Sequence, residues 1–186
     1  MNLIDCLKNN AERNPTKIGF IDEERSLTFK EMYDEVQKFS ENISKFIVPT
    51  TKVVSLISEN STSFVIAYLG IINSGIAVHL TPTNISETSL VNQVESTGSK
   101  MIFCSEMTEK LGIFHADSFV PFKPVPISKL AEMTARLVDN EEVQVQTPTD
   151  VAYLIYTSGT TGEPKGVPVS HDMVEFTTKN IIDVLG

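Results

Sequence analysis

A loop that combines glycines, hydroxyl groups and one lysine is the part of the chain best equipped for chemistry. Residues Tyr156–Gly166 read YTSGTTGEPKG. Glycines let main-chain N–H groups approach a ligand closely, and serine and threonine hydroxyls can donate hydrogen bonds to anionic oxygens. Lys165 adds a compact positive charge. This combination of donors, flexible backbone and one cation favours a site that grips a polyphosphate.

The sequence of the loop excludes two common phosphate-binding motifs. A Walker A loop requires Ser or Thr directly after GK, whereas Lys165 is followed by Gly166 and Val167. The loop also leads into Val167–Ser170, which is typical of a short strand rather than of a helix. The G-x-G-x-x-G fingerprint of dinucleotide-binding folds is absent too. The chain is therefore not expected to be a kinase or NTPase of the Walker A type.

The longer run Val151–His171, VAYLIYTSGTTGEPKGVPVSH, resembles the signature of the adenylate-forming enzymes. This superfamily includes acyl-CoA synthetases, the adenylation domains of nonribosomal peptide synthetases, and luciferases. The pieces of the family signature follow in the same order: an aromatic residue, then TSGTTG, one variable residue and PKG, and finally an apolar strand that ends in SH. A plain polar turn between two strands would also be rich in such residues, but the ordered match counts against that alternative.

The resemblance implies ligands and residue roles. In the family this loop, here Thr157–Gly166, holds the β- and γ-phosphates of ATP, and Mg²⁺ neutralises part of the triphosphate charge. Thr161 is a candidate ligand for that ion. The family role in binding ATP is carried over to these positions: Thr157, Ser158, Gly159, Thr160, Thr161, Gly162 and Lys165.

Two further segments resemble motifs of the same family less specifically. They are SLTFKEMYDEV (Ser26–Val36) and LGIINSGIAVHLTPTN (Leu69–Asn84). In the second, His79 stands where the family often has an aromatic residue or asparagine. We expect His79 to be a partly buried structural histidine.

Short apolar strands alternate with helical patterns, which predicts an α/β fold with a mostly parallel sheet flanked by helices. A capping box, Thr28–Glu31, begins one helix, which Pro49 is expected to close. The region 112–127 is predicted to be a loop or an edge strand, and residues 139–150 a connector. The predicted strands are Lys17–Ile21, Lys52–Ser58, Ile76–Leu80, Lys100–Cys104 and Val167–Ser170; the other predicted helices are an N-terminal one ending near Asn14, Phe64–Ile72, Ser86–Thr97, Ser128–Leu137 and a closing helix, Asp172–Leu185.

Composition is that of an ordinary soluble globular domain. Hydrophobic residues make up 41% and charged residues 21% of the 186 positions. The net charge of −9 disfavours nucleic acid or anionic lipid as a partner. The longest apolar run, Phe64–Ile72, is too short to span a bilayer, and the N-terminus has no secretion signal. These features favour a cytoplasmic protein without a membrane partner.

No metal site or redox motif is visible in the sequence. Cys6 and Cys104 are far apart and form no CxxC, so we expect two buried or half-buried thiols in a reducing compartment. The three histidines show no ligand spacing with Cys, Asp or Glu. We name no catalytic residue and no resident metal site on this chain.

The resemblance covers the whole chain, residues 1–186, but only the front portion of the family's proteins. In the family, later segments bind adenine and the carboxylic-acid substrate, and a small C-terminal domain, absent here, supplies a catalytic lysine. The chain alone is therefore expected to be an inactive part of an AMP-forming acid–thiol ligase. The acyl substrate and the thiol acceptor, coenzyme A or a carrier protein, cannot be read from these residues.

Three interpretations compete. The first, which we favour, is the N-terminal fragment of such a ligase, and it predicts a large exposed apolar surface. The second is half of a split enzyme, completed by a partner chain that covers this surface. The third is a non-catalytic binding or scaffold module, which predicts a well-covered surface or a symmetric dimer.

Overall fold

The core of the protein is a six-stranded sheet with the strand order β6-β5-β3-β4-β7-β8. The computed structural model describes residues 3–47, 50–99, 101–105, 124–129, 150–157 and 164–185. Strands β6, β5, β3, β4 and β7 pair in parallel, and β8 pairs antiparallel with β7. The prediction of an α/β fold with a mostly parallel sheet is confirmed. The strands are β3 (Val53–Ile57), β4 (Ala77–Thr81), β5 (Ile102–Cys104), β6 (Pro124–Pro126), β7 (Val151–Thr157) and β8 (Lys165–Ser170).

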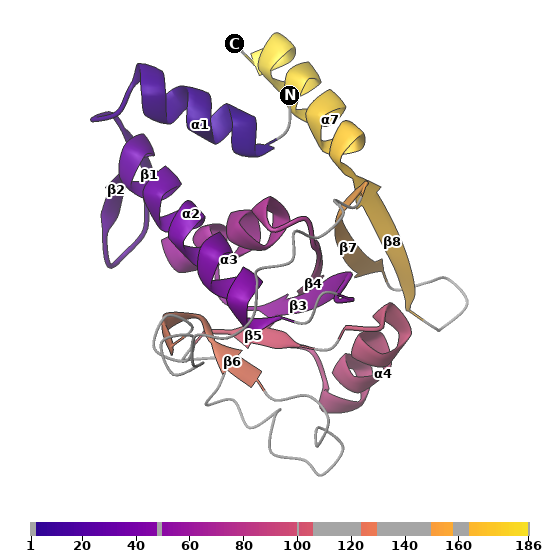
Figure 1. Ribbon diagram of the computed structural model, residues 1–186. Helices are drawn as coiled ribbons and strands as arrows, with labels where there is room; N and C mark the ends of the chain where they lie inside the picture. Colours follow the sequence, from indigo (N-terminus) through magenta and orange to yellow (C-terminus); the bar gives the residue numbers. More distant parts are fainter. Residues whose placement is uncertain are drawn as a thin grey trace.

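Helices cover both faces of this sheet (Figure 1). Helices α2 (Phe29–Phe46) and α3 (Thr62–Asn73) lie on one face, and α4 (Glu87–Thr97) lies on the other. Side chains of β3 alternate accordingly, because successive residues of a strand point to opposite faces. Leu56 belongs to the core under α2 and α3, whereas Ile57 packs with Leu90 of α4.

The helix ends agree with the local signals in the sequence. The capping box of α2 is present: the amide of Glu31 donates to the Thr28 hydroxyl, and the Glu31 carboxylate accepts from the Thr28 amide. Ser61 caps α3, and Gly98, with φ 68°, ends α4 in the left-handed conformation that glycine favours. Helix α2 already ends at Phe46, ahead of Pro49, which lies outside the described residues.

A small N-terminal unit packs beside the main sheet. It consists of α1 (Leu3–Arg13) and the antiparallel hairpin β1 (Ile18–Ile21) and β2 (Ser26–Thr28). The Asp22 carboxylate in the hairpin turn accepts a 2.7 Å hydrogen bond from the Thr62 amide at the start of α3. This bond, followed by that from the Arg25 amide, holds the pKa of Asp22 well below its usual range. The turn is thereby fixed to the first turn of α3.

Several predicted elements are only partly described. Strand β6 lies at one end of the sheet order, as expected for an edge strand within 112–127. Ile127–Lys129 forms a short 3₁₀ turn, and the rest of the predicted helix Ser128–Leu137 lies outside the described residues. The predicted connector 139–150 does too, apart from Asp150.

One of the two expectations about the cysteines is wrong. Cys104 is buried as expected, but Cys6 is exposed, because α1 turns Ile4, Leu7 and Ala11 toward the core instead. The predicted closing helix Asp172–Leu185 is confirmed as α7 (His171–Leu185). Among the α7 side chains that the structure describes, Val174 packs against the main core, whereas Met173, Phe176 and Ile181 are each more than half exposed, at 57%, 69% and 52%.

The described residues contain no helix that combines the length and the apolar character needed to cross a membrane.

Candidate functional site

The predicted phosphate loop connects β7 to β8 in a strand–bend–strand arrangement. Thr157, the last residue of β7, pairs with Lys165, the first residue of β8. The structure thus brings together the two predicted site residues that it describes, and both are exposed. The remaining predicted site residues lie outside the described residues: Ser158, Gly159, Thr160, Thr161 and Gly162.

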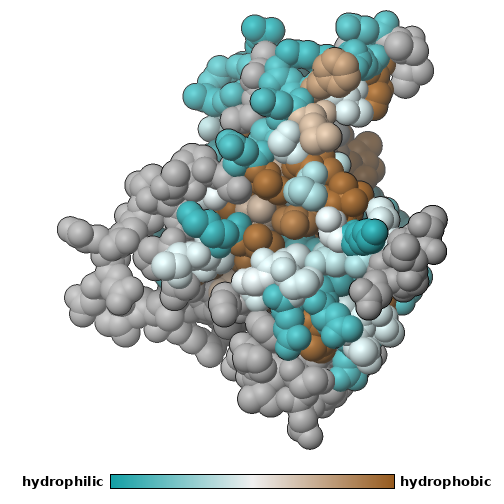
Figure 2. Space-filling view, turned by 90° about the vertical axis from the view of Figure 1, so that its right-hand side faces the viewer, coloured by the Kyte–Doolittle hydropathy of each residue, from teal (hydrophilic) through white to brown (hydrophobic). Residues whose placement is uncertain are grey.

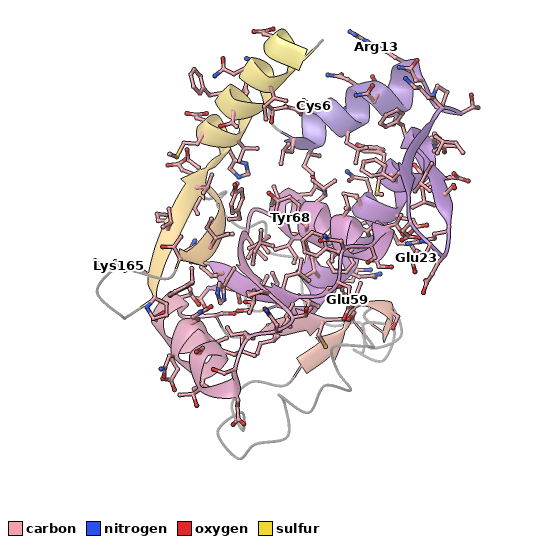
Figure 3. All side chains as sticks on the ribbon, turned by 180° about the vertical axis from the view of Figure 1, so that it is seen from behind. Cys6, Arg13, Glu23, Glu59, Tyr68 and Lys165 are labelled. Carbon is pink, nitrogen blue, oxygen red and sulfur yellow. The ribbon has the colours of Figure 1, made fainter. Side chains whose placement is uncertain are left out.

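Strand β7 ends at the carboxyl edge of the parallel strands. Strand β7 runs parallel to β4, so Thr157, its last residue, lies at the same edge of the sheet as Thr81, the last residue of β4. Ligands of open α/β sheets bind at this edge. Lys165 stands at the end of β8 that lies beside α4, as Figure 3 shows. Among the described residues, Lys165 has no salt-bridge partner, so its ammonium group is accessible to an anion.

Tyr156 precedes Thr157, the last residue of β7, and it contacts three other elements of the fold. Its hydroxyl is hydrogen bonded to the Ser96 hydroxyl on α4. Its ring meets the His79 ring edge-on, with centroids 5.3 Å apart. On the neighbouring strand its partner is Gly166.

His79 on β4 is fully buried, which corrects the expectation of partial burial. Its Nδ1 lies 2.9 Å from the Ser55 hydroxyl, and its Nε2 lies 3.2 Å from the Gln93 amide oxygen. Ser55 continues the chain of hydrogen bonds to Ser99 at 3.0 Å. Burial lowers the pKa of His79, a shift that the Gln93 contact opposes. The histidine is structural, as predicted, and it supports the strand that carries the bend.

Sequence reasoning did not find the α4 residues that contact His79 and Tyr156. Gln93 and Ser96 are one helical turn apart on α4 and contact His79 and Tyr156 respectively. Their spacing of three residues places them on one helix face. Nothing in the sequence indicates that this face contacts β7, because the contact between positions 96 and 156 depends on the crossover that contains α4.

A mostly parallel sheet with the TSGTTG sequence starting at the last residue of β7 is the arrangement that the resemblance to the adenylate-forming enzymes implies. A family model described as AMP-binding enzyme matches residues 7–184. The chain belongs to this AMP-binding enzyme family.

Relatives and solved structures agree with this membership. The 4-hydroxybenzoate–CoA/benzoate–CoA ligase of Rhodopseudomonas palustris is 28% identical over 181 residues, covering 93% of this chain and 34% of the ligase. Tyrocidine synthase 3 of Brevibacillus parabrevis is 28% identical over 170 residues, covering 91% of this chain and 2% of the synthase. The structure of the o-succinylbenzoate coenzyme A synthetase of Bacillus subtilis in complex with AMP matches 98% of this chain and 46% of the synthetase, with a TM-score of 0.77 and 22% identity. The chain thus spans only part of the length of these proteins.

Proposed function

We propose that this chain is the N-terminal part of an ATP-dependent ligase that activates a carboxylic acid as an acyl-adenylate and then transfers the acyl group to a thiol. The bend from Thr157 to Gly166 binds the β- and γ-phosphates of ATP. Ser158, Gly159, Thr160, Thr161 and Gly162 supply amide and hydroxyl donors to phosphate oxygens, and Lys165 supplies the charge. The observation that carries the proposal is the pairing of Thr157 with exposed Lys165 at the carboxyl edge of the parallel strands.

The chemistry of the proposed site is positioning and charge neutralisation. In such a reaction a carboxylate oxygen attacks the α-phosphorus of ATP, and pyrophosphate leaves. Holding the β- and γ-phosphates fixes the leaving group and stabilises the charge that develops on it. The adenine, the α-phosphate and the carboxylate must be held by other groups, which we assign to the part of the relatives that this chain does not span.

Magnesium enters this proposal with the substrate. The described residues hold no group of three or more His, Cys, Asp or Glu that could bind a metal. Mg²⁺ is commonly held by substrate phosphates with few protein ligands, which fits such a site. The Bacillus subtilis synthetase has been solved with ATP and magnesium ion. On this chain we propose the Thr161 hydroxyl as a ligand of Mg·ATP.

The surface of α7 supports an incomplete ligase over a free-standing scaffold module. Phe176 and Met173 are exposed at 69% and 57%, whereas a self-sufficient module would cover such side chains. This surface fits both a fragment and half of a split enzyme. The acceptor thiol, on coenzyme A or a carrier protein, and the carboxylic acid belong to the complete enzyme in either case.

Binding of inorganic tripolyphosphate and Mg·ATP by titration calorimetry tests the phosphate site. We expect Lys165→Ala to weaken binding about ten- to a hundredfold, since a charge-assisted hydrogen bond contributes about 1.5–3 kcal/mol. Lys38→Ala, which removes an exposed lysine from α2, is the matched control and leaves binding unchanged. Equal effects of the two substitutions, or no binding by the unmodified chain, would refute the phosphate site.

Pyrophosphate exchange tests the incompleteness of the chain. The isolated chain is expected to show negligible exchange with a broad panel of carboxylic acids, because we assign the groups for the α-phosphate and the carboxylate to the part of the relatives that this chain does not span. Robust exchange by the isolated chain would show that the active site is complete within these 186 residues.

A further inference from the structure

Tyr156 is held from three directions at the point where β7 enters the bend. Its hydroxyl contacts Ser96 of α4, its ring packs edge-on against buried His79 of β4, and its cross-strand partner on β8 is Gly166. Three separate elements of the fold therefore meet on one side chain. The sequence motif alone gives this tyrosine no role beyond that of an aromatic residue before the loop.

Gly166 provides the space in which the Tyr156 ring lies. A methyl group added at Gly166 would be 3.1 Å from Cζ and 3.2 Å from the hydroxyl oxygen of Tyr156. Among the described glycines only Gly75 and Gly98 have positive φ, so backbone strain does not explain glycine at position 166. The missing side chain lets the ring lie across the start of β8. One side chain thus rests on both strands that flank the bend.

The direction of the Tyr156 hydrogen bond follows from the contacts of Ser96. The Ser96 hydroxyl donates its single proton to the carbonyl oxygen of Gln93 at 3.1 Å. The Tyr156 hydroxyl is therefore the donor to Ser96 Oγ. Gln93 in turn contacts His79 Nε2 with its side chain. One turn of α4 therefore contacts both Tyr156 and His79, the histidine against which the Tyr156 ring packs.

We propose that Tyr156 is a positioning residue that keeps the two ends of the bend, Thr157 and Lys165, together and tied to α4. By pre-organising these ends it strengthens the binding of a triphosphate group, since ordering a loop on binding costs affinity. The class of ligand rests on the proposed function, whereas the anchoring itself rests on the contacts of Tyr156 with Ser96, His79 and Gly166.

Hydrogen–deuterium exchange of the Thr157 and Lys165 amides tests the anchor without any ligand. We expect Tyr156→Phe and Ser96→Ala each to speed this exchange about three- to tenfold, the equivalent of one hydrogen bond of roughly 0.5–1.5 kcal/mol. The double variant is expected to be no faster than either single variant, because both remove the same bond. Tyr153→Phe is the matched control: it lies on the same strand, its ring packs on Tyr68, and no described residue is hydrogen bonded to its hydroxyl.

Affinity for inorganic tripolyphosphate separates positioning from general stability. Tyr156→Phe and Ser96→Ala are expected to weaken binding about threefold or more, while the midpoint of thermal unfolding falls by no more than the few degrees that one hydrogen bond accounts for. The Tyr153→Phe control is expected to bind as the unmodified chain does. Unchanged exchange at Thr157 and Lys165, an equal effect in Tyr153→Phe, or additive effects in the double variant would overturn the anchor. Lack of tripolyphosphate binding by the unmodified chain would instead refute the proposed function, and the exchange measurement would still decide the anchor.

Discussion

His79 shows how a polar residue can be accommodated in the middle of a central strand. Its described hydrogen-bond partners, Ser55, Thr81 and Gln93, are all neutral. A protonated imidazole would have no carboxylate to balance its charge in this buried position. Burial therefore favours the neutral ring, which packs edge-on against Tyr156.

Protonation of His79 should couple stability to pH. The pKa is lowered in the folded state by burial, so the unfolded chain binds the proton more readily. The stabilisation is present above the ordinary histidine pKa of about 6.5 and is lost as the pH falls below it, by at most about 1.4 kcal/mol per pH unit. Urea unfolding at about pH 7.5 and about pH 5.5 should show this loss, and His79→Gln should reduce it. An identical loss in His79→Gln would contradict the assignment.

Elements whose limits are set by local signals were predicted well. The Thr28–Glu31 capping box, the Ser86 and Gly98 ends of α4, and the strand at Val53–Ile57 are all encoded within a few residues. Contacts between distant elements were not predicted. The contact of Tyr156 with Ser96 depends on the crossover that brings α4 beside β7, and its contact with Gly166 depends on the antiparallel register of β7 and β8. No local pattern encodes either contact.

The close approach of α2 and α3 is one such contact, and Gly70 permits it. A Cβ atom at Gly70 would lie 2.5 Å from Cδ1 of Phe39, whose ring packs in turn on Phe103. We expect Gly70→Ala to lower the free energy of unfolding by about 1–2 kcal/mol, because overpacking outweighs a gain in helix propensity of about 1 kcal/mol. Urea unfolding measures this change.

A second background shows whether the clash is the cause. In Phe39→Leu, which removes the ring, the same Gly70→Ala change is expected to cost little or to stabilise the chain. An equal cost in both backgrounds would mean that Gly70 matters for another reason.

At the scale of the whole molecule, the described chain leaves one region open. Strand β8 is at the end of the sheet order, and α7, which follows it, exposes Met173, Phe176 and Ile181. Figure 2 shows apolar groups gathered in the middle of the face that carries these elements. Because the chain covers only 34% of its benzoate–CoA ligase relative, this face is where we expect the remainder of a complete ligase to pack.

Without such a covering, the α7 surface should drive self-association. Exposed apolar area favours burial at roughly 25 cal/mol per Å², while the net charge of −9 opposes close approach of two chains. The variant Met173→Ser/Phe176→Ser/Ile181→Ser is expected to shift sedimentation velocity profiles toward the monomer. Its thermal unfolding midpoint should change little, because these side chains are mostly exposed.

A matched control uses exposed apolar residues elsewhere. Ile18 and Ile21 of β1 are 49% and 73% exposed, on the hairpin rather than on α7. If exposed apolar area alone decides association, Ile18→Ser/Ile21→Ser will act like the α7 variant. If association is specific to the face that a complete ligase covers, only the α7 variant will dissociate. A docking face on α7 requires that association depend on the α7 residues themselves. Equal behaviour of the two variants would therefore show that α7 is not a docking face.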